Sequence, residues 1–281
     1  MIGGSETVIL SAVFAGAVAV GVTAAIERWG GIAGGLLGTL PTTIVPAALG
    51  IHAQSASTEA FQAALVATPW GLLANAAFLL TWRVVPRRLP PTWPLSARLA
   101  LMAALSLAVW TLLALVLTAA LRGLLARGVP PLTLGALATV ALAGVGVGAA
   151  NRRVPAPSGR RRVRPLVLAS RGLLAGAAIG VSVLLAASGD PVLAGLAAVF
   201  PAIFLTTMIS LWLAQGEAVP AGAVGPMVLG STSVAVFSTL AAGTMPAWGA
   251  IPGASGAWVL SALVVTAPAG FWLWRRGDGS P

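Results

Sequence analysis

The chain has 281 residues, of which 58% are hydrophobic and 8% are charged, and its mean hydropathy is +0.97. A soluble domain carries roughly 25% charged residues, so this composition places the chain in a lipid bilayer. All 16 basic residues are Arg, Cys is absent and His52 is the only histidine, which excludes disulfides, thiolate nucleophiles and Cys-ligated zinc. The net charge of +10 does not indicate nucleic-acid binding, because the arginines flank apolar segments instead of forming one basic face.

Nine segments are apolar enough to cross a membrane, since a spanning helix needs about 20 residues. They are residues 7–26, 31–51, 60–82, 98–121, 131–150, 166–187, 192–214, 218–243 and 255–274. The first is expected to be retained, because the stretch before it contains Glu6 and lacks the basic region of a signal peptide. The sequence therefore predicts an all-α polytopic membrane protein with about nine transmembrane helices.

The arginines predict how the chain is oriented. With nine helices, one side of the membrane receives most of them: Arg28, Arg83, Arg87, Arg88, Arg98, the run from Arg152 to Arg171, Arg275 and Arg276. The other side receives Arg122 and Arg127. Because basic residues near helix ends stay in the cytoplasm, we expect the N-terminus outside and the C-terminus in the cytoplasm.

One pattern occurs twice, about 160 residues apart, and predicts an internal repeat. The matched landmarks are Gly35 with Gly195, Pro41 with Pro201, Gln54 with Gln215, Glu59 with Glu217 and Pro69 with Pro226. Five helices separate the starts of the two copies, so the second copy enters the membrane from the opposite side. We divide the chain into a first repeat (1–125), a fifth helix with an Arg-rich linker (126–165) and a second repeat (166–281). The alternative is chance similarity in a chain rich in Ala, Leu, Gly and Pro.

Both copies resemble a known family of membrane proteins. The stretches Ile32 to Trp70 (IAGGLLGTLPTTIVPAALGIHAQ onward) and Leu193 to Gly230 (LAGLAAVFPAIFLTTMISLWLAQ onward) are similar to the four-helix bacterial inner-membrane proteins of the GlpM family and its DUF3147-type relatives. The resemblance implies a four-helix fold unit and a bacterial inner membrane, but no catalytic or ligand residues. The chain departs from the family at Gly34-Gly35, where the family has Ala-Gly, and in its fifth helix.

The paired prolines point to a candidate site. A proline inside an apolar helix frees a backbone carbonyl, and such interruptions near the midplane often form the substrate site of a transporter. The candidate substrate-binding residues are Thr39, Pro41, Thr42, Thr43, Asn75, Pro201, Thr206, Thr207, Ser231 and Ser233. The alternative is a simple kink, with the hydroxyls bonded to their own helices and small residues used for packing.

Ionisable residues supply two further candidates. Glu59 and Glu217 could relay a proton or cation, although each follows a short polar break where a carboxylate also complements the helix dipole. In antiparallel repeats they lie toward opposite faces and cannot form one carboxylate pair. In the linker, Arg160, Arg161, Arg162 and Arg164 are expected to contact anionic lipid headgroups.

These features favour a transporter of a small solute or ion that works by alternating access near Pro41 and Pro201. The alternatives are a non-transporting assembly or accessory protein, and a lipid-handling protein with a lateral groove between the repeats. An enzyme is not expected, because acids, bases and nucleophiles are too few for general acid-base or covalent catalysis. We expect no cofactor, no metal and no nucleic-acid partner. A homodimer formed through small-residue helix faces is possible.

Overall fold

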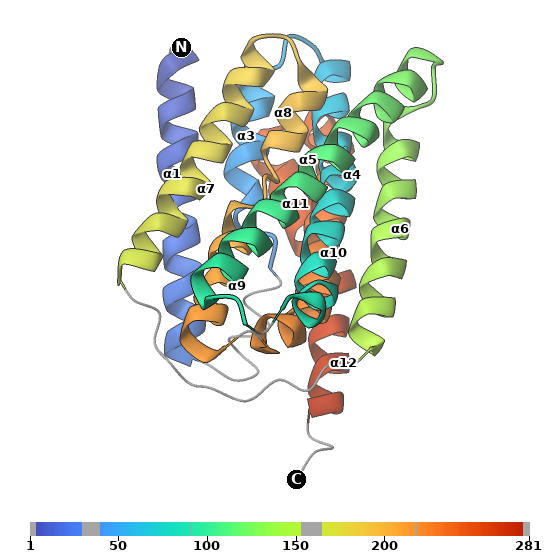
Figure 1. Ribbon diagram of the computed structural model, residues 1–281. Helices are drawn as coiled ribbons and strands as arrows, with labels where there is room; N and C mark the ends of the chain where they lie inside the picture. The colour runs from blue at the N-terminus through green and yellow to red at the C-terminus, as the bar shows by residue number, and fades with distance from the viewer. Residues whose placement is uncertain (1–3, 30–39, 91, 153–164, 217, 278–281) are drawn as a thin grey trace.

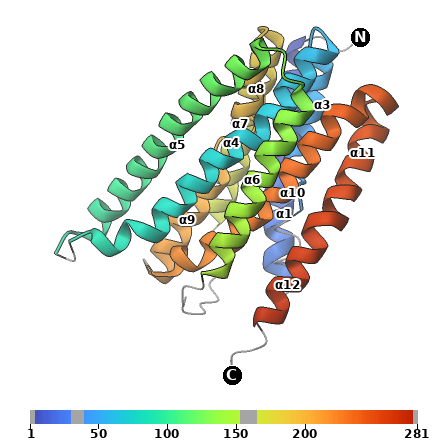
Figure 2. The ribbon, with the colours of Figure 1, turned by 90° about the vertical axis from the view of Figure 1, so that its right-hand side faces the viewer.

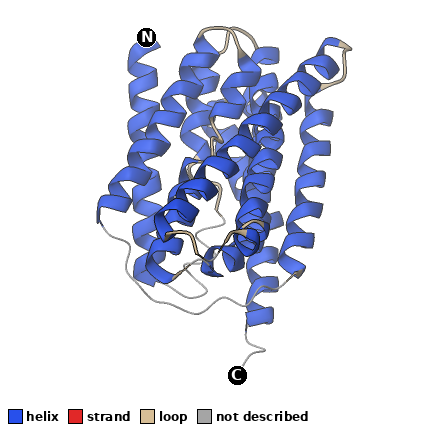
Figure 3. Cartoon of the chain, viewed as in Figure 1, coloured by secondary structure: helices blue, strands red, loops and turns tan. Residues whose placement is uncertain are grey.

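A computed structural model describes residues 4–29, 40–90, 92–152, 165–216 and 218–277, and this part of the chain is a bundle of helices joined by short loops (Figures 1 and 3). The helices are α1 (Gly4–Trp29), α3 (Ile44–Gln54), α4 (Thr58–Val84), η1 (Pro86–Arg88), α5 (Leu95–Ala126), α6 (Pro131–Asn151), α7 (Pro165–Ala187), α8 (Pro191–Ala197), α9 (Ala202–Gln215), α10 (Ala218–Trp248), α11 (Ala250–Ser261), the π-helical turn η2 (Ala262–Thr266) and α12 (Ala267–Gly277).

The described residues contain seven helical spans long and apolar enough to cross a membrane. Two shorter apolar helices, Ser5–Gly21 and Ile44–Gln54, accompany them. The predicted class, an all-α polytopic membrane protein, is therefore confirmed. Lipid imposes this architecture, because every backbone polar group in the hydrocarbon region needs a partner within the protein and a helix supplies one for nearly all of them.

Successive helices run in alternating directions between two ends of the bundle. The N-terminus lies at one end and the C-terminus at the other (Figure 1). Consequently α7 runs opposite to α1, the α8–α9 pair opposite to α3, α10 opposite to α4, and α11–α12 opposite to α5. The two sets of helices are thus inverted relative to each other, and α6 lies between them in the chain. The residue boundaries of the predicted division into repeats stay a prediction.

The centre of the bundle is formed by α4 and α10. Figure 2 shows α5 on one flank and α11–α12 on the other, with α4, α6 and α10 between them. Residues in the spans of α4 and α10 are mostly buried within the protein, whereas those of α5 and α11–α12 are mostly exposed. The outer helices therefore present apolar side chains to the surrounding lipid.

Glycines allow the backbones of neighbouring helices to approach closely. A Cβ on Gly176 of α7 would lie 2.7 Å from the carbonyl oxygen of Ala12 on α1, and a Cβ on Gly146 of α6 would lie 2.9 Å from the Cα of Leu229 on α10. Small residues at such contacts are the usual basis of helix association in a bilayer, where no hydrophobic driving force between helices exists. These contacts fix the positions of α7 and α10 against their neighbours.

Two of the nine predicted segments differ from single helices. In segment 192–214, α8 ends at Ala197 and α9 begins at Ala202, so the helix is broken rather than kinked. In segment 31–51, the described helix α3 begins only at Ile44, and residues 30–39 lie outside the described part. Pro41 is therefore in a turn before a helix and not in the middle of one. The other seven segments match helical stretches whose ends coincide with the predicted ends or lie at most five residues beyond them, and the ninth consists of α11, η2 and α12 in succession.

Candidate functional site

The break between α8 and α9 leaves four residues outside regular helix. In this segment Phe200 N–H donates to Ala197 O (3.1 Å) and Ala202 N–H donates to Phe200 O (2.8 Å), which turns the chain before α9 starts. Pro201 is buried at the N-cap of α9. Because proline has no N–H, it is tolerated at the start of a helix and disfavoured in its interior. The sequence therefore breaks the helix at this point.

The first set of helices has a matching turn. Pro41 is buried, Thr42 N–H donates to Leu40 O (2.9 Å), and α3 begins two residues later at Ile44. A small cavity of about 30 Å³ adjoins both turns, and the residues that line it are Ala15, Thr43, Ala175, Ala178, Ile179, Ala198, Phe200, Ala202 and Ile203. This volume is about that of one water molecule. The fold thus brings Thr43 of one half next to the break in the other half.

Side chains from two neighbouring helices bind the backbone of the broken segment. Asn75 on α4 donates from Nδ2 to the carbonyl of Val199 at 2.8 Å. Thr68 on the same helix donates to Gly195 O at 3.4 Å, and Ser182 on α7 donates to Ala194 O at 2.7 Å. Asn75 is 2% exposed, and its Oδ1 has no hydrogen-bond partner among the described residues. A buried amide oxygen of this kind can accept a hydrogen bond from a solute or a water molecule.

The hydroxyl candidates on α10 are buried. Ser231 donates to Val228 O (2.7 Å) and Ser233 donates to Gly230 O (2.8 Å), both within α10. Between them, the buried hydroxyl of Thr232 has no hydrogen-bond partner among the described residues. Sequence reasoning missed Thr232, although it lies in the same Ser-Thr-Ser run as the two predicted serines.

The hydroxyls of Thr206 and Thr207 donate hydrogen bonds to carbonyls at the start of their own helix, α9. The Thr206 hydroxyl donates to Ala202 O and Ile203 O, both at 3.0 Å, and the Thr207 hydroxyl donates to Ile203 O at 2.7 Å. Hydroxyls bonded to the preceding turn are satisfied without any ligand. Their arrangement matches the alternative interpretation of these two residues as structural.

The ionisable candidates lie away from the centre. Glu59 is exposed in the first turn of α4, next to the N-cap Ser57, whose side chain accepts a 3.2 Å hydrogen bond from Ala60 N–H. This position suits a carboxylate that complements the helix dipole. The remaining candidates, Thr39, Glu217, Arg160, Arg161, Arg162 and Arg164, lie outside the described residues. Within the described part, no group of three or more His, Cys, Asp or Glu residues could hold a metal ion.

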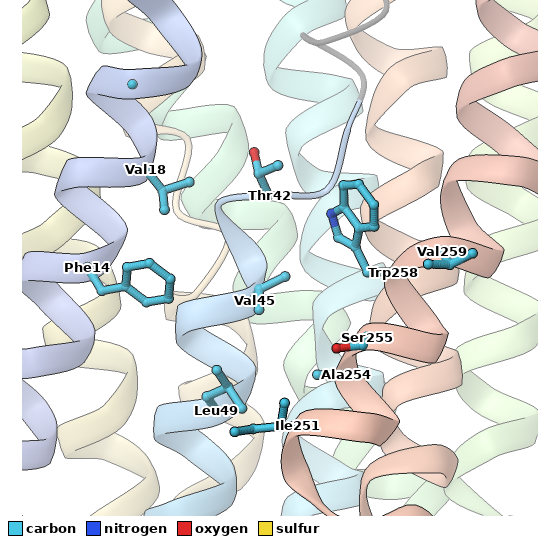
Figure 4. A pocket seen from close by; sticks show the side chains of 11 residues that line it. Phe14, Val18, Thr42, Val45, Leu49, Ile251, Ala254, Ser255, Trp258 and Val259 are labelled. Carbon is cyan, nitrogen blue, oxygen red and sulfur yellow. The ribbon is translucent and has the colours of Figure 1, made fainter.

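A larger cavity of about 590 Å³, open to the surface of the bundle, lies between α1, α3 and α11 (Figure 4). The residues that line it are Phe14, Val18, Gly21, Thr42, Val45, Leu49, Ile251, Ala254, Ser255, Trp258 and Val259. Sequence reasoning identified only Thr42 among them. The others carry no signal in the sequence, because ordinary apolar residues of three helices line a cavity only when those helices are placed side by side.

Polar contacts join the two halves at both ends of the bundle. At the end where the C-terminus lies, Arg83 of α4 donates from Nη1 to Ala149 O of α6 (2.7 Å) and from Nε to Ala221 O of α10 (3.3 Å). At the opposite end, the guanidinium of Arg122 on α5 donates to both carboxylate oxygens of Asp190, at 2.8 and 2.6 Å. These contacts tie the two sets of helices together at each end of the bundle.

Comparison with known proteins does not assign the chain to a family. Scans of protein-family models, curated proteins and solved structures found no significant match. The resemblance to the GlpM family stays a prediction from the residues quoted above.

Proposed function

We propose that this multi-pass membrane protein is a transporter that carries a small solute by alternating access between its two inverted sets of helices. The observation that supports this most is the proximity of the two turns: Thr43 lines the same cavity as Ala198 and Phe200 of the broken helix. Broken helices that meet near the membrane centre supply free backbone groups to a solute. Asn75 adds a buried amide oxygen beside the break.

The contacts at the two ends suit such a mechanism. Arg83 links α4 to α6 and α10 at one end of the bundle, and the Arg122–Asp190 ion pair links α5 to the loop before α8 at the other. Alternating access requires that one end opens while the other stays closed. Breaking the Arg83 hydrogen bonds costs on the order of 1–3 kcal/mol, and breaking the exposed ion pair costs at most about 1 kcal/mol, which a bound solute can supply.

The proposal also states the membrane in which the protein lies and the side on which its C-terminus is found. The described arginines at positions 83, 87, 88, 98, 152, 171 and 275 belong to helix ends on the side of the C-terminus, whereas Arg122 and Arg127 belong to the N-terminal side. By the positive-inside rule the C-terminal side is cytoplasmic, in a bacterial inner membrane.

A thiol reagent can test the function without knowledge of the solute, because the chain contains no cysteine. An Ala198→Cys variant in oriented proteoliposomes is treated with a membrane-impermeant maleimide from either side. A transporter exposes this position to water on both sides in turn, so labelling from both sides is expected. Ala241→Cys, at a fully buried position of α10, is the unreactive control. Labelling from one side only, or from neither, contradicts alternating access.

The second candidate function is a non-transporting assembly or accessory protein. The small cavity at the two turns is lined mainly by Ala, Ile and Phe, which is what a closed, filled bundle requires. Absence of labelling at Ala198→Cys from both sides would favour this candidate.

A further inference from the structure

We infer that the cavity between α1, α3 and α11 binds an uncharged, mainly hydrocarbon molecule that carries one or two oxygen atoms and reaches the protein from the bilayer. This inference rests on the proposed function, because it names the chemical class of the solute. Cavities of about 300–1,000 Å³ hold small ligands, and this cavity of about 590 Å³ is within that range.

The described lining of the cavity is unfavourable for a charged ligand. Among the described residues, no Arg, Asp, Glu or His lines it, and the side chains are apolar apart from those of Thr42, Ser255 and Trp258. A charge moved into such surroundings loses its hydration and finds no counter-ion, which costs several kcal/mol. A hydrocarbon chain that moves from the bilayer into the cavity loses no hydration, because the lining is as apolar as lipid.

Two hydroxyls in the cavity define where the oxygen atoms of the ligand would bind. Within the described part of the chain, neither the Thr42 side chain nor the Ser255 side chain has a hydrogen-bond partner. Figure 4 shows Thr42 and Trp258 toward one end of the cavity, and Leu49 and Ile251 toward the other. The ligand would therefore place an oxygen atom near Thr42 and hydrocarbon near Leu49.

The walls of the cavity continue into the lipid-facing surface. Phe14 of α1 is 51% exposed and Ile251 of α11 is 72% exposed, and both also line the cavity. Helix α11 belongs to one of the seven apolar spans and α1 contains a shorter apolar helix, so we expect these exposed faces to contact lipid and not water. A ligand that enters here partitions into the bilayer first.

The cavity also adjoins the proposed transport centre. Thr42 lines the 590 Å³ cavity, and the next residue, Thr43, lines the small cavity at the two turns. One turn of chain therefore separates the two. A molecule bound against Thr42 contacts the segment whose rearrangement would open the centre, which couples binding to the proposed movement.

Photolabelling can test this inference on the full-length protein in liposomes. The probe is a 16-carbon alcohol with a diazirine in its chain, and the charged control probe is the quaternary ammonium analogue of the same chain. We expect saturable labelling by the alcohol, mapped to peptides containing residues 42–49 and 251–259, and no saturable labelling by the cation. Labelling that rises linearly with probe and spreads over all lipid-facing helices would be ordinary lipid contact and would overturn the inference.

Two variants and a matched control make the test specific. Ser255→Trp fills the cavity and should abolish saturable labelling, whereas Leu263→Trp, at a 62% exposed position of η2 that does not line the cavity, should leave it unchanged. Thr42→Val keeps the shape of the side chain and removes the hydroxyl, so the concentration for half-maximal labelling should rise about three- to tenfold. An unchanged concentration contradicts the assignment of Thr42.

The outcome for the cavity is separate from that for transport. Saturable labelling together with an unreactive Ala198→Cys would support ligand binding in the cavity and contradict the proposed transport function. Reaction of Ala198→Cys from both sides without saturable labelling would support the proposed transport function and contradict the inferred class of solute.

Discussion

Asn75 on α4 donates a 2.8 Å hydrogen bond to the carbonyl of Val199, 124 positions later in the chain, in the break between α8 and α9. Both residues are buried, at 2% and 8% exposure. A helix break inside a bilayer leaves carbonyls that water cannot reach, so each needs a partner from the protein. Asn75 supplies that partner and joins the first set of helices to the broken helix of the second.

Replacing Asn75 with Leu should therefore destabilise the protein. The Val199 carbonyl would lose its side-chain partner, at a cost of about 1–2 kcal/mol in the free energy of unfolding. Steric trapping in bicelles measures this quantity. Thr81→Val on the same helix is the control, because the Thr81 hydroxyl donates at 2.9 Å to Ala77 O within α4. If both variants lose equal stability, the interhelical bond does not hold the break.

Gly195 is a second point where α8 is held against α4. A Cβ at this position would overlap the carbonyl oxygen of Ala64, which is backbone and cannot turn aside. Gly195→Ala should lower the free energy of unfolding by about 1–3 kcal/mol, because α8 must move away from α4. Gly144→Ala on α6 is the matched control, since no heavy atom lies within 4 Å of its new methyl group. Equal stability of the two variants would show that α8 and α4 are not in contact at Gly195.

Asp190 has two interactions and Arg122 takes part in one of them. The Asp190 carboxylate accepts from Leu193 N–H at 3.1 Å as the N-cap of α8, and it also binds Arg122. Asp190→Ala should lower the free energy of unfolding by about 1–2 kcal/mol, mostly because α8 loses its N-cap. Arg122→Gln should lower the free energy of unfolding by at most about 1 kcal/mol, because exposed ion pairs contribute little to stability and are screened by salt.

A double-mutant cycle distinguishes these two contributions. In the Asp190→Ala background, Arg122→Gln should have no further effect on the free energy of unfolding. An equal loss in both backgrounds would show that Arg122 acts through a contact other than this ion pair.

The orientation of the helices can be tested with single cysteines in this cysteine-free chain. Ala56→Cys and Ser188→Cys lie in loops at the end where the N-terminus lies, and both positions are exposed. Thr92→Cys and Asn151→Cys lie at the other end, also exposed. On intact cells an impermeant maleimide should label the first pair, and the second pair only after the membrane is permeabilised. The reverse pattern would place the C-terminus outside.

The prolines show how far local sequence could predict the site. Pro201 marks the interruption of the second copy, because a missing N–H acts on the nearest backbone whatever surrounds it. The same reasoning made Thr206 and Thr207 candidates, and their hydroxyls instead bond to the preceding turn of α9. The direction in which a hydroxyl points depends on the geometry of its helix and on the neighbouring side chains. Closeness to a proline in the sequence does not specify it.

The amino-acid sequence determined the membrane environment, the helical class and the position of the break at Pro201, because apolar length and proline act locally along the chain. Only the tertiary structure decided that Thr43 lies beside Ala198, that Asn75 reaches Val199 and that three helices line an open apolar cavity next to Thr42. These relationships depend on which helix faces meet. In a chain made mostly of Ala, Leu, Gly and Val, many faces are similarly apolar, and close packing of particular small residues selects among them.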